Sequence, residues 1–159
     1  MIIVSGLPRS GTSLMCQLLQ SAGLKVADDG KRKADGHNPY GYFEVEGIIG
    51  KLKDNPGYLD TLNANAVKVV AHGLYHVPEK SDVIYMIRAV DEIKESMSRM
   101  VAKSLNGLDK LNGSILAYAY RNFNVLTVSF DQLVKRKDVK SIEGFIGKVI
   151  DSKVIHTRN

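Results

Sequence analysis

The sequence predicts an α/β fold with three layers, in which a mostly parallel sheet of about five strands is covered by helices on both faces. Three observations support this prediction. Short apolar runs of strand length alternate with longer segments in which apolar residues recur at helical spacing. A glycine-rich turn follows the first apolar run. The 159 residues have the length of one domain, so residues 1–159 are expected to form a single domain with one sizeable core.

The first part of the chain opens with a strand expected over residues 2–5. A helix is expected over residues 12–22, because the apolar residues at 14, 15, 18, 19 and 22 fall on one helical face. A short second strand is expected over residues 24–27. Residues 28–42 are rich in Gly, Asp and Lys and predict a loop. Loops of this length are uncommon in compact domains and usually carry function.

The rest of the chain continues the alternation of strands and helices. Buried strands are expected over residues 67–71, 83–87 and 124–130, and an edge strand over residues 154–156. Helices are expected over residues 46–54, 91–103, 109–121 and 142–150. Strands separated by helices in this way are typical of βαβ units, whose parallel strands end at one common edge of the sheet.

Composition narrows the classes of function. The single cysteine, Cys16, excludes an internal disulfide and a multi-cysteine zinc site, and its place on the first helix indicates packing. The sequence shows no secretory signal and no apolar run near the roughly 20 residues that span a bilayer, so a soluble, cytoplasmic protein without a membrane partner is expected. The net charge of +5 favours anionic ligands. Nucleic acid is not expected, because tryptophan is absent and basic residues do not alternate with aromatic ones.

The strongest functional signal is the turn between the first strand and the first helix. Gly6 and Gly11 have the spacing of a P-loop, in which backbone N–H groups and a helix N-terminus hold phosphate oxygens. A P-loop NTPase places a lysine directly after the second glycine, on the β- and γ-phosphates. Thr12 stands at that position here. Arg9, inside the loop, is therefore the expected substitute cation, and its planar guanidinium suits a tetrahedral oxyanion.

The loop resembles the 5′-phosphosulfate loop of the sulfotransferase superfamily, which reads Pro-Lys/Arg-Ser-Gly-Thr-Thr/Ser. The matching residues of this sequence are Pro8, Arg9, Ser10, Gly11, Thr12 and Ser13. A second match lies downstream, where Arg88 follows the strand expected over residues 83–87 and Ser96 comes eight residues later. In the family, an arginine and a serine in this arrangement hold the 3′-phosphate of the donor. A weaker match is the segment of residues 38–44, which is similar to the Gly-Tyr-(Phe/Trp)-Glu segment of bacterial members.

The resemblance covers roughly residues 2–135 and implies a P-loop fold that uses 3′-phosphoadenosine 5′-phosphosulfate (PAPS) as donor. The product would be 3′-phosphoadenosine 5′-phosphate (PAP), and no metal is expected. The binding residues implied are those of the loop together with Arg88 and Ser96. The chain is shorter than usual members and lacks their C-terminal segment rich in Arg, Lys and Gly, which closes over the 3′-phosphate. Either the donor binds weakly, or another chain completes the site, as in a homo-oligomer.

Sulfuryl transfer to a hydroxyl needs a general base as well as the loop cation Arg9. The sequence offers two candidates, and both stay open. Glu44 follows the long loop, near the expected entrance of an acceptor. His72 follows the strand expected over residues 67–71, in a stretch similar to the Lys-Thr-His stretch of cytosolic sulfotransferases.

Two other functions are compatible with the same motifs. The first is a non-catalytic domain that binds PAPS or PAP, which the short C-terminal part favours. The second is a P-loop small-molecule kinase, against which the absent lysine argues. The acceptor is expected to be a small molecule or a saccharide that offers a hydroxyl or an amine, and no motif identifies it.

Overall fold

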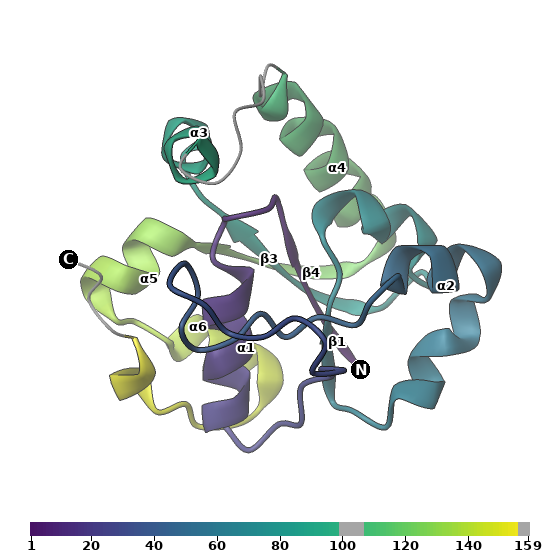
Figure 1. The fold of residues 1–159 in the computed structure, drawn as a ribbon, viewed down its shortest axis with the longest axis horizontal. Helices are drawn as coiled ribbons and strands as arrows, with labels where there is room; N and C mark the ends of the chain where they lie inside the picture. The colour runs from purple at the N-terminus through teal and green to yellow at the C-terminus, as the bar shows by residue number, and fades with distance from the viewer. Residues whose placement is uncertain (99–106, 156–159) are drawn as a thin grey trace.

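The computed structural model describes residues 1–98 and 107–155, which form an α/β fold around a parallel sheet (Figure 1). The strands of the sheet are β1 (Ile2–Gly6), β2 (Ala66–Lys68), β3 (Asp82–Ile87) and β4 (Asn124–Ser129). All of their pairings are parallel, in the order β2-β1-β3-β4. The predicted fold class is therefore confirmed.

The number of strands differs from the prediction. The described residues form a sheet of four strands rather than about five. Residues 24–27 contribute one isolated bridge, between Val26 and Ala66, because the backbone leaves the sheet edge directly afterwards for the long loop. The predicted edge strand at residues 154–156 is also wrong for its described part, since Ser152–Val154 forms the 3-10 helix η3. His156 lies outside the described residues.

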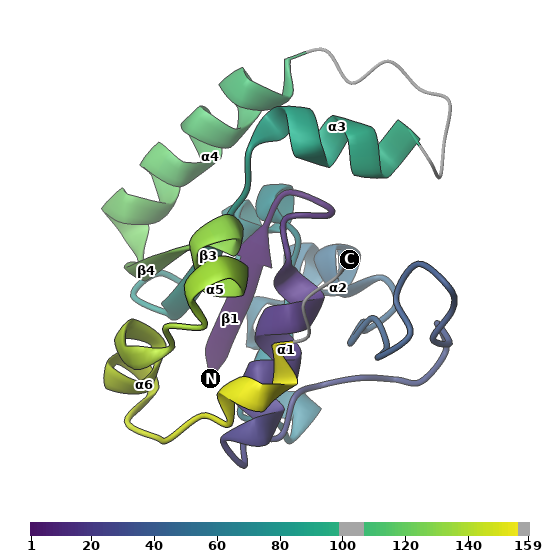
Figure 2. The same cartoon turned by 90° about the vertical axis from the view of Figure 1, so that its left-hand side faces the viewer.

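Helices cover both faces of the sheet (Figures 1 and 2). One face carries α1 (Thr12–Ser21), α5 (Phe130–Arg136) and α6 (Lys140–Ile146). The other carries α2 (Ile48–Asp54), the 3-10 helices η1 (Pro56–Leu62) and η2 (Ala71–His76), and α4 (Leu108–Asn122). Neighbouring strand residues point to opposite faces. Val4 and Ile84 accordingly belong to the core beneath α1, and Ile3 and Val83 to the core beneath α2 and α4.

The segment after β2 forms a helix where a longer strand was predicted. The strand over residues 67–71 is expected to continue to Ala71, but β2 ends at Lys68. Val69 still donates to the Val4 carbonyl oxygen at 2.9 Å, and β1 turns away after Gly6, so the later residues lose their partner strand. Ala71 and Leu74 are both buried, and their spacing of three residues matches one turn of a 3-10 helix.

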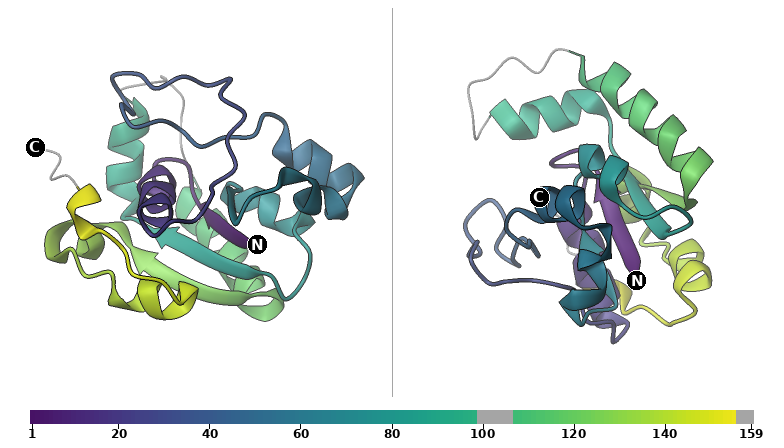
Figure 3. Two further views of the ribbon diagram at one scale, coloured as in Figure 1. Left: turned by 90° about the horizontal axis from the view of Figure 1, so that it is seen from below. Right: turned by 90° about the vertical axis from the view of Figure 1, so that its right-hand side faces the viewer.

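The strand order reverses its direction between β1 and β3. The chain leaves β1 toward β2 on one side and leaves β3 toward β4 on the other, and such a reversal opens a crevice in α/β sheets. Helix α3 (Val90–Ser98) lies across this end of the sheet (Figure 2). The helix was predicted to reach residue 103, and residues 99–103 lie outside the described part. The long loop of residues 28–42 lies on the outer side of α1, away from the sheet (Figure 3).

Candidate phosphate-binding site

The turn between β1 and α1 depends on glycine at its first position. Gly6 has φ +148°, and a Cβ there would lie 2.4 Å from Ser10 Oγ and 2.7 Å from the Met86 carbonyl oxygen. The next residues turn tightly, with the Ser10 N–H donating to the Leu7 carbonyl oxygen at 3.1 Å. Arg9 occupies the left-handed region with φ 67°, which non-glycine residues rarely adopt. Strained backbone of this kind is concentrated at ligand sites.

The helix that follows the turn begins with its N–H groups unobstructed by a capping side chain. Gly11 is the N-cap of α1, with φ 100°, and a Cβ at this position would lie 2.4 Å from Phe130. The first N–H groups of a helix have no partner within the helix and carry partial positive charge. Ser10 and Thr12 are both buried beside them, and the Ser10 hydroxyl has no hydrogen-bond partner among the described residues. The turn therefore has the donors needed to hold a phosphate or sulfate group.

Arg9 and Ser96, which lie 87 residues apart in the sequence, are in contact in the structure. Arg9 Nε donates to Ser96 Oγ at 3.0 Å. Ser96 is on α3, so this hydrogen bond joins the glycine-rich turn to the helix at the end of the sheet. Both residues are only partly exposed. The cation expected at the transferred group and the hydroxyl expected at the 3′-phosphate thus belong to one site.

Arg88 supports the same turn from the end of β3. Its Nη1 donates to the Arg9 carbonyl oxygen at 3.1 Å, and its Nε forms an ion pair with Glu92 Oε2 at 3.1 Å. The Arg88 guanidinium also lies over the Phe130 ring, 4.5 Å from the ring centroid. These contacts fix the guanidinium beside the turn while using only some of its five N–H donors. Arg9, Arg88 and Ser96 therefore lie together at the turn after β1.

The remaining predicted loop residues point in other directions. Pro8 is exposed at the tip of the turn. Ser13 Oγ donates to the Tyr42 carbonyl oxygen at 3.5 Å, which brings the first turn of α1 against the long loop. Cys16 is fully buried on α1, and burial raises the pKa of its thiol to about 12. Such a thiol stays protonated, in agreement with a packing role.

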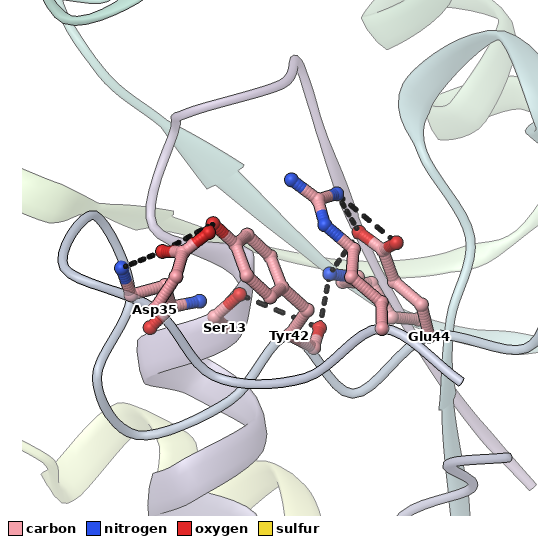
Figure 4. A network of polar contacts seen from close by, with 7 residues as sticks. Ser13, Asp35, Tyr42 and Glu44 are labelled. Carbon is pink, nitrogen blue, oxygen red and sulfur yellow. Dashed lines mark hydrogen bonds and ion pairs between the residues drawn. The ribbon is translucent and has the colours of Figure 1, made fainter. Parts of the chain in front are cut away.

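Glu44 is held by two cations rather than standing alone (Figure 4). Its Oε1 lies 3.0 Å from Lys68 Nζ and 3.0 Å from Arg32 Nη1. Lys68 also donates to the Tyr42 carbonyl oxygen, and its side chain is only 6% exposed. Burial acts to raise the pKa of Glu44, but Lys68 and Arg32 outweigh burial and hold this pKa below its ordinary value. Glu44 is therefore a carboxylate at neutral pH.

Tyr42 organises the loop around this ion pair. Its hydroxyl donates to the Asp35 carboxylate, with both oxygens at 2.8 Å. The Arg32 guanidinium stacks on the Tyr42 ring, 3.5 Å from the ring centroid. The hydrogen bond from Tyr42 lowers the pKa of Asp35. The long loop is thus tied to β2 and α1 by specific polar contacts, as Figure 4 shows for Ser13, Asp35, Tyr42 and Glu44.

His72 occupies a different position from the one expected. It lies in η2 rather than directly after a strand, because β2 ends earlier than predicted, and its side chain is exposed. For a metal, the described residues 1–98 and 107–155 contain no cluster of three or more His, Cys, Asp or Glu side chains close enough to coordinate one. The same part of the chain contains no helix with the length and apolar character needed to cross a bilayer.

The ion pairs of Glu44 predict a pH-dependent contribution to stability. A carboxyl group whose pKa is lowered in the folded state stabilises the fold above its ordinary pKa, here 4.5, and this contribution is lost as the pH falls through the folded pKa. Glu44→Gln should therefore be less stable than the wild type at neutral pH, with a gap that narrows on acidification to about pH 3. Urea unfolding at several pH values measures the gap. Glu79→Gln, at an exposed site, should show no such trend, and a constant gap for Glu44→Gln would contradict the assignment.

The sequence prediction missed Lys68, Arg32 and Tyr42 as parts of the site. The sequence does contain a feature that could have identified Lys68, because this lysine stands among the apolar residues Ala66, Val67, Val69 and Val70. A lysine in a buried strand needs a charged partner. Arg32 and Tyr42 have no comparable signal, since charged and aromatic residues are ordinary in surface loops.

Comparisons with known proteins address the fold. No family model matches the sequence, and no curated protein matches it. Among solved structures, the chain is similar to the unliganded crystal structure of a sugar kinase from Janibacter sp. HTCC2649. The two are 14% identical, the match covers 96% of each chain, and the TM-score is 0.54. At this identity the likeness shows a shared α/β fold with helices on both sides of a parallel sheet.

Proposed function

We propose that this chain transfers a sulfuryl group from PAPS to a hydroxyl or amine of a small-molecule or saccharide acceptor. The observation that supports the proposal is the convergence of Arg9, Arg88 and Ser96 on the turn after β1. Two guanidinium groups and a serine hydroxyl at the end of a parallel sheet suit a donor with two separate anionic groups. Thr12, where ATP-using P-loop enzymes place lysine, favours a donor other than ATP.

The proposed reaction is an in-line displacement at sulfur. The acceptor oxygen or nitrogen forms a new bond to sulfur while the bond from sulfur to the bridging oxygen of PAPS breaks, and PAP leaves. The N–H groups of the turn and Arg9 stabilise the negative charge that develops on the leaving 5′-phosphate. Arg88 and Ser96 hold the 3′-phosphate, so that binding energy positions the sulfuryl group for attack.

A base must take the proton that the acceptor loses. Glu44 is the candidate that the arrangement favours, because it is ionised and belongs to the loop that packs against α1 through Tyr42. Its ion pairs with Lys68 and Arg32 make it a weak base. It therefore orients the acceptor through a hydrogen bond and takes the proton late, as the bond to sulfur forms. His72 is the second candidate and sits exposed on η2.

A small-molecule kinase is the second candidate function. The shared fold with a sugar kinase favours it, since the two chains match over 96% of their lengths. In that case Ser13, directly after Thr12, would stand where P-loop kinases bind Mg²⁺. A third reading is binding of PAP or PAPS without transfer.

Ligand-induced stabilisation separates these candidates. A ligand at 100 times its dissociation constant stabilises a protein by about 2.7 kcal/mol, which for a chain of this size raises the melting temperature by roughly 5–10 °C. We expect this increase with PAP and a much smaller one with ATP and Mg²⁺. The reverse result would support the kinase. Binding of PAP without PAP release from PAPS in the presence of acceptors would support the non-catalytic reading.

A matched pair of variants tests whether the nucleotide binds beside Ser96. Ser96→Ala removes the hydroxyl that meets Arg9 and should reduce the effect of PAP on the melting temperature. Ser98→Ala, two residues further along α3, removes a hydroxyl that donates to the Glu95 carbonyl oxygen and should leave that effect unchanged. Equal effects of the two variants would contradict the placement.

A further inference from the structure

A cavity lies at the carboxyl end of β2, the strand next to β1. Its volume is about 550 Å³, within the range of small-molecule sites. Its walls come from the long loop, from residues 44–48 that follow this loop, and from Lys68 and Val70 at the end of β2. The charged residues of the walls are Asp29, Lys31, Arg32, Glu44, Glu46 and Lys68.

The charges in this cavity balance one another. The walls carry as many cationic as anionic side chains, and the cations are engaged by the carboxylates. Lys31 forms an ion pair with Glu46, while Arg32 and Lys68 share Glu44. The Asp29 carboxylate accepts the backbone N–H groups of Glu46 at 2.7 Å and Lys31 at 3.0 Å. The cavity therefore has no surplus charge with which to bind an anion or a cation.

A balanced set of charges favours a ligand that is polar and neutral. A charged ligand would be desolvated here without a free counter-charge, which is costly. A hydroxyl group donates one hydrogen bond and accepts two, so it can lie between a carboxylate and a cation and bond to both. Val45, Ile48 and Val70 add apolar surface to the same walls, which suits the C–H faces of a carbon skeleton.

The cavity wall is joined to the first turn of α1 through the carbonyl group of Tyr42. Lys68 Nζ and Ser13 Oγ both donate to the carbonyl oxygen of Tyr42. Ser13 belongs to the first turn of α1, where the anion is expected to bind. The cavity wall and the first turn of α1 therefore share one hydrogen-bond acceptor.

We propose that this cavity binds the acceptor, and that the acceptor is an uncharged polyhydroxylated molecule of the sugar class. Glu44 accepts a hydrogen bond from one hydroxyl of this molecule, and Arg32 and Lys68 donate to neighbouring oxygens. The assignment rests on the proposed transfer, because it identifies the ligand of this cavity with the acceptor of that reaction.

Saturation-transfer NMR tests the assignment on the full chain. The probes are glucose, galactose and myo-inositol as neutral polyols, and glucuronic acid and glucose 6-phosphate as their charged counterparts, each measured with and without PAP. We expect saturation transfer to at least one neutral polyol, and about tenfold weaker binding of the charged counterparts. The PAP signals in the same samples report on the nucleotide site separately.

Two variants test whether the polyol that receives saturation transfer binds in this cavity. Arg32→Met removes a half-exposed guanidinium that lines the wall and should weaken polyol binding about tenfold, as expected for the loss of a hydrogen bond to a charged group. Arg136→Met, at an exposed site on α5, is the matched control and should bind as the wild type does. Both variants should retain the PAP signal.

The outcomes of the two measurements are independent. PAP binding without any neutral polyol overturns the acceptor assignment and leaves the proposed transfer standing. Polyol binding without PAP supports the cavity and contradicts PAPS as donor. Tighter binding of glucuronic acid or glucose 6-phosphate than of glucose overturns the argument from balanced charge, as does unchanged polyol binding in Arg32→Met.

Discussion

Arg9→Ala is expected to lower the rate of sulfuryl transfer by at least about 100-fold, because it removes the cation nearest the charge that develops on the leaving group. The fold should survive, since Arg9 is partly exposed and Ala keeps the backbone of the turn. The loss of the bond to Ser96 should cost no more than about 1 kcal/mol of unfolding free energy. The rate is measured in reactions that contain PAPS and a mixture of neutral monosaccharides as acceptors. Chromatography quantifies the PAP that is released.

Two further variants make this result specific. Arg9→Lys restores the charge without the planar guanidinium that bonds Ser96, so it should recover part of the lost rate. Arg136→Ala removes an exposed arginine from α5 and should transfer at the wild-type rate. A near wild-type rate for Arg9→Ala would exclude Arg9 from the reaction.

Gly6→Ala is expected to cost about 2–3 kcal/mol of unfolding free energy and to abolish PAP binding. The new Cβ would lie 2.7 Å from the Met86 carbonyl oxygen, and the alanine would have to adopt a φ of +148°. Met86 belongs to β3, which pairs with β1 through Gly6, so relief of the clash separates the two strands that carry the site. Urea unfolding gives the change in stability, and calorimetry with PAP gives the affinity.

Gly36→Ala is the matched control for this variant. A Cβ at Gly36 would have no atom within 4 Å, and its φ is not in the left-handed region. The change in unfolding free energy should stay within about 0.5 kcal/mol. Similar losses in Gly6→Ala and Gly36→Ala would show that the turn tolerates a side chain at its first position.

The sequence was sufficient for the elements with clear periodicity. The two helices, after the glycine-rich turn and around residues 109–121, follow from apolar residues at helical spacing, and the strand before the turn follows from its short length and the glycine that ends it. The end of β2 was not predictable in the same way. Apart from Lys68, residues 67–71 are apolar, so their pattern fits a strand throughout, and only the position of β1 in space decides where pairing stops.

One part of the candidate site could be predicted from the sequence, and another part could not. The convergence of Arg9, Arg88 and Ser96 could be predicted, because parallel strands bring their carboxyl ends to one edge. The network around Glu44 could not, because it depends on how a loop with no periodic pattern folds back over α1. Glu44 was expected as a candidate base, and its two ion-pair partners lie 12 positions before it and 24 positions after it in the sequence.

The strand order has a consequence for how the chain emerges from the ribosome. β1 is made first, yet its two neighbours, β2 and β3, begin at residues 66 and 82. At about 5–20 residues per second, both edges of this apolar strand stay open for several seconds after it appears. An exposed apolar strand with two free edges is prone to pair with other chains. Protection of the nascent segment that contains β1, for example by a chaperone, should therefore raise the yield of folded protein.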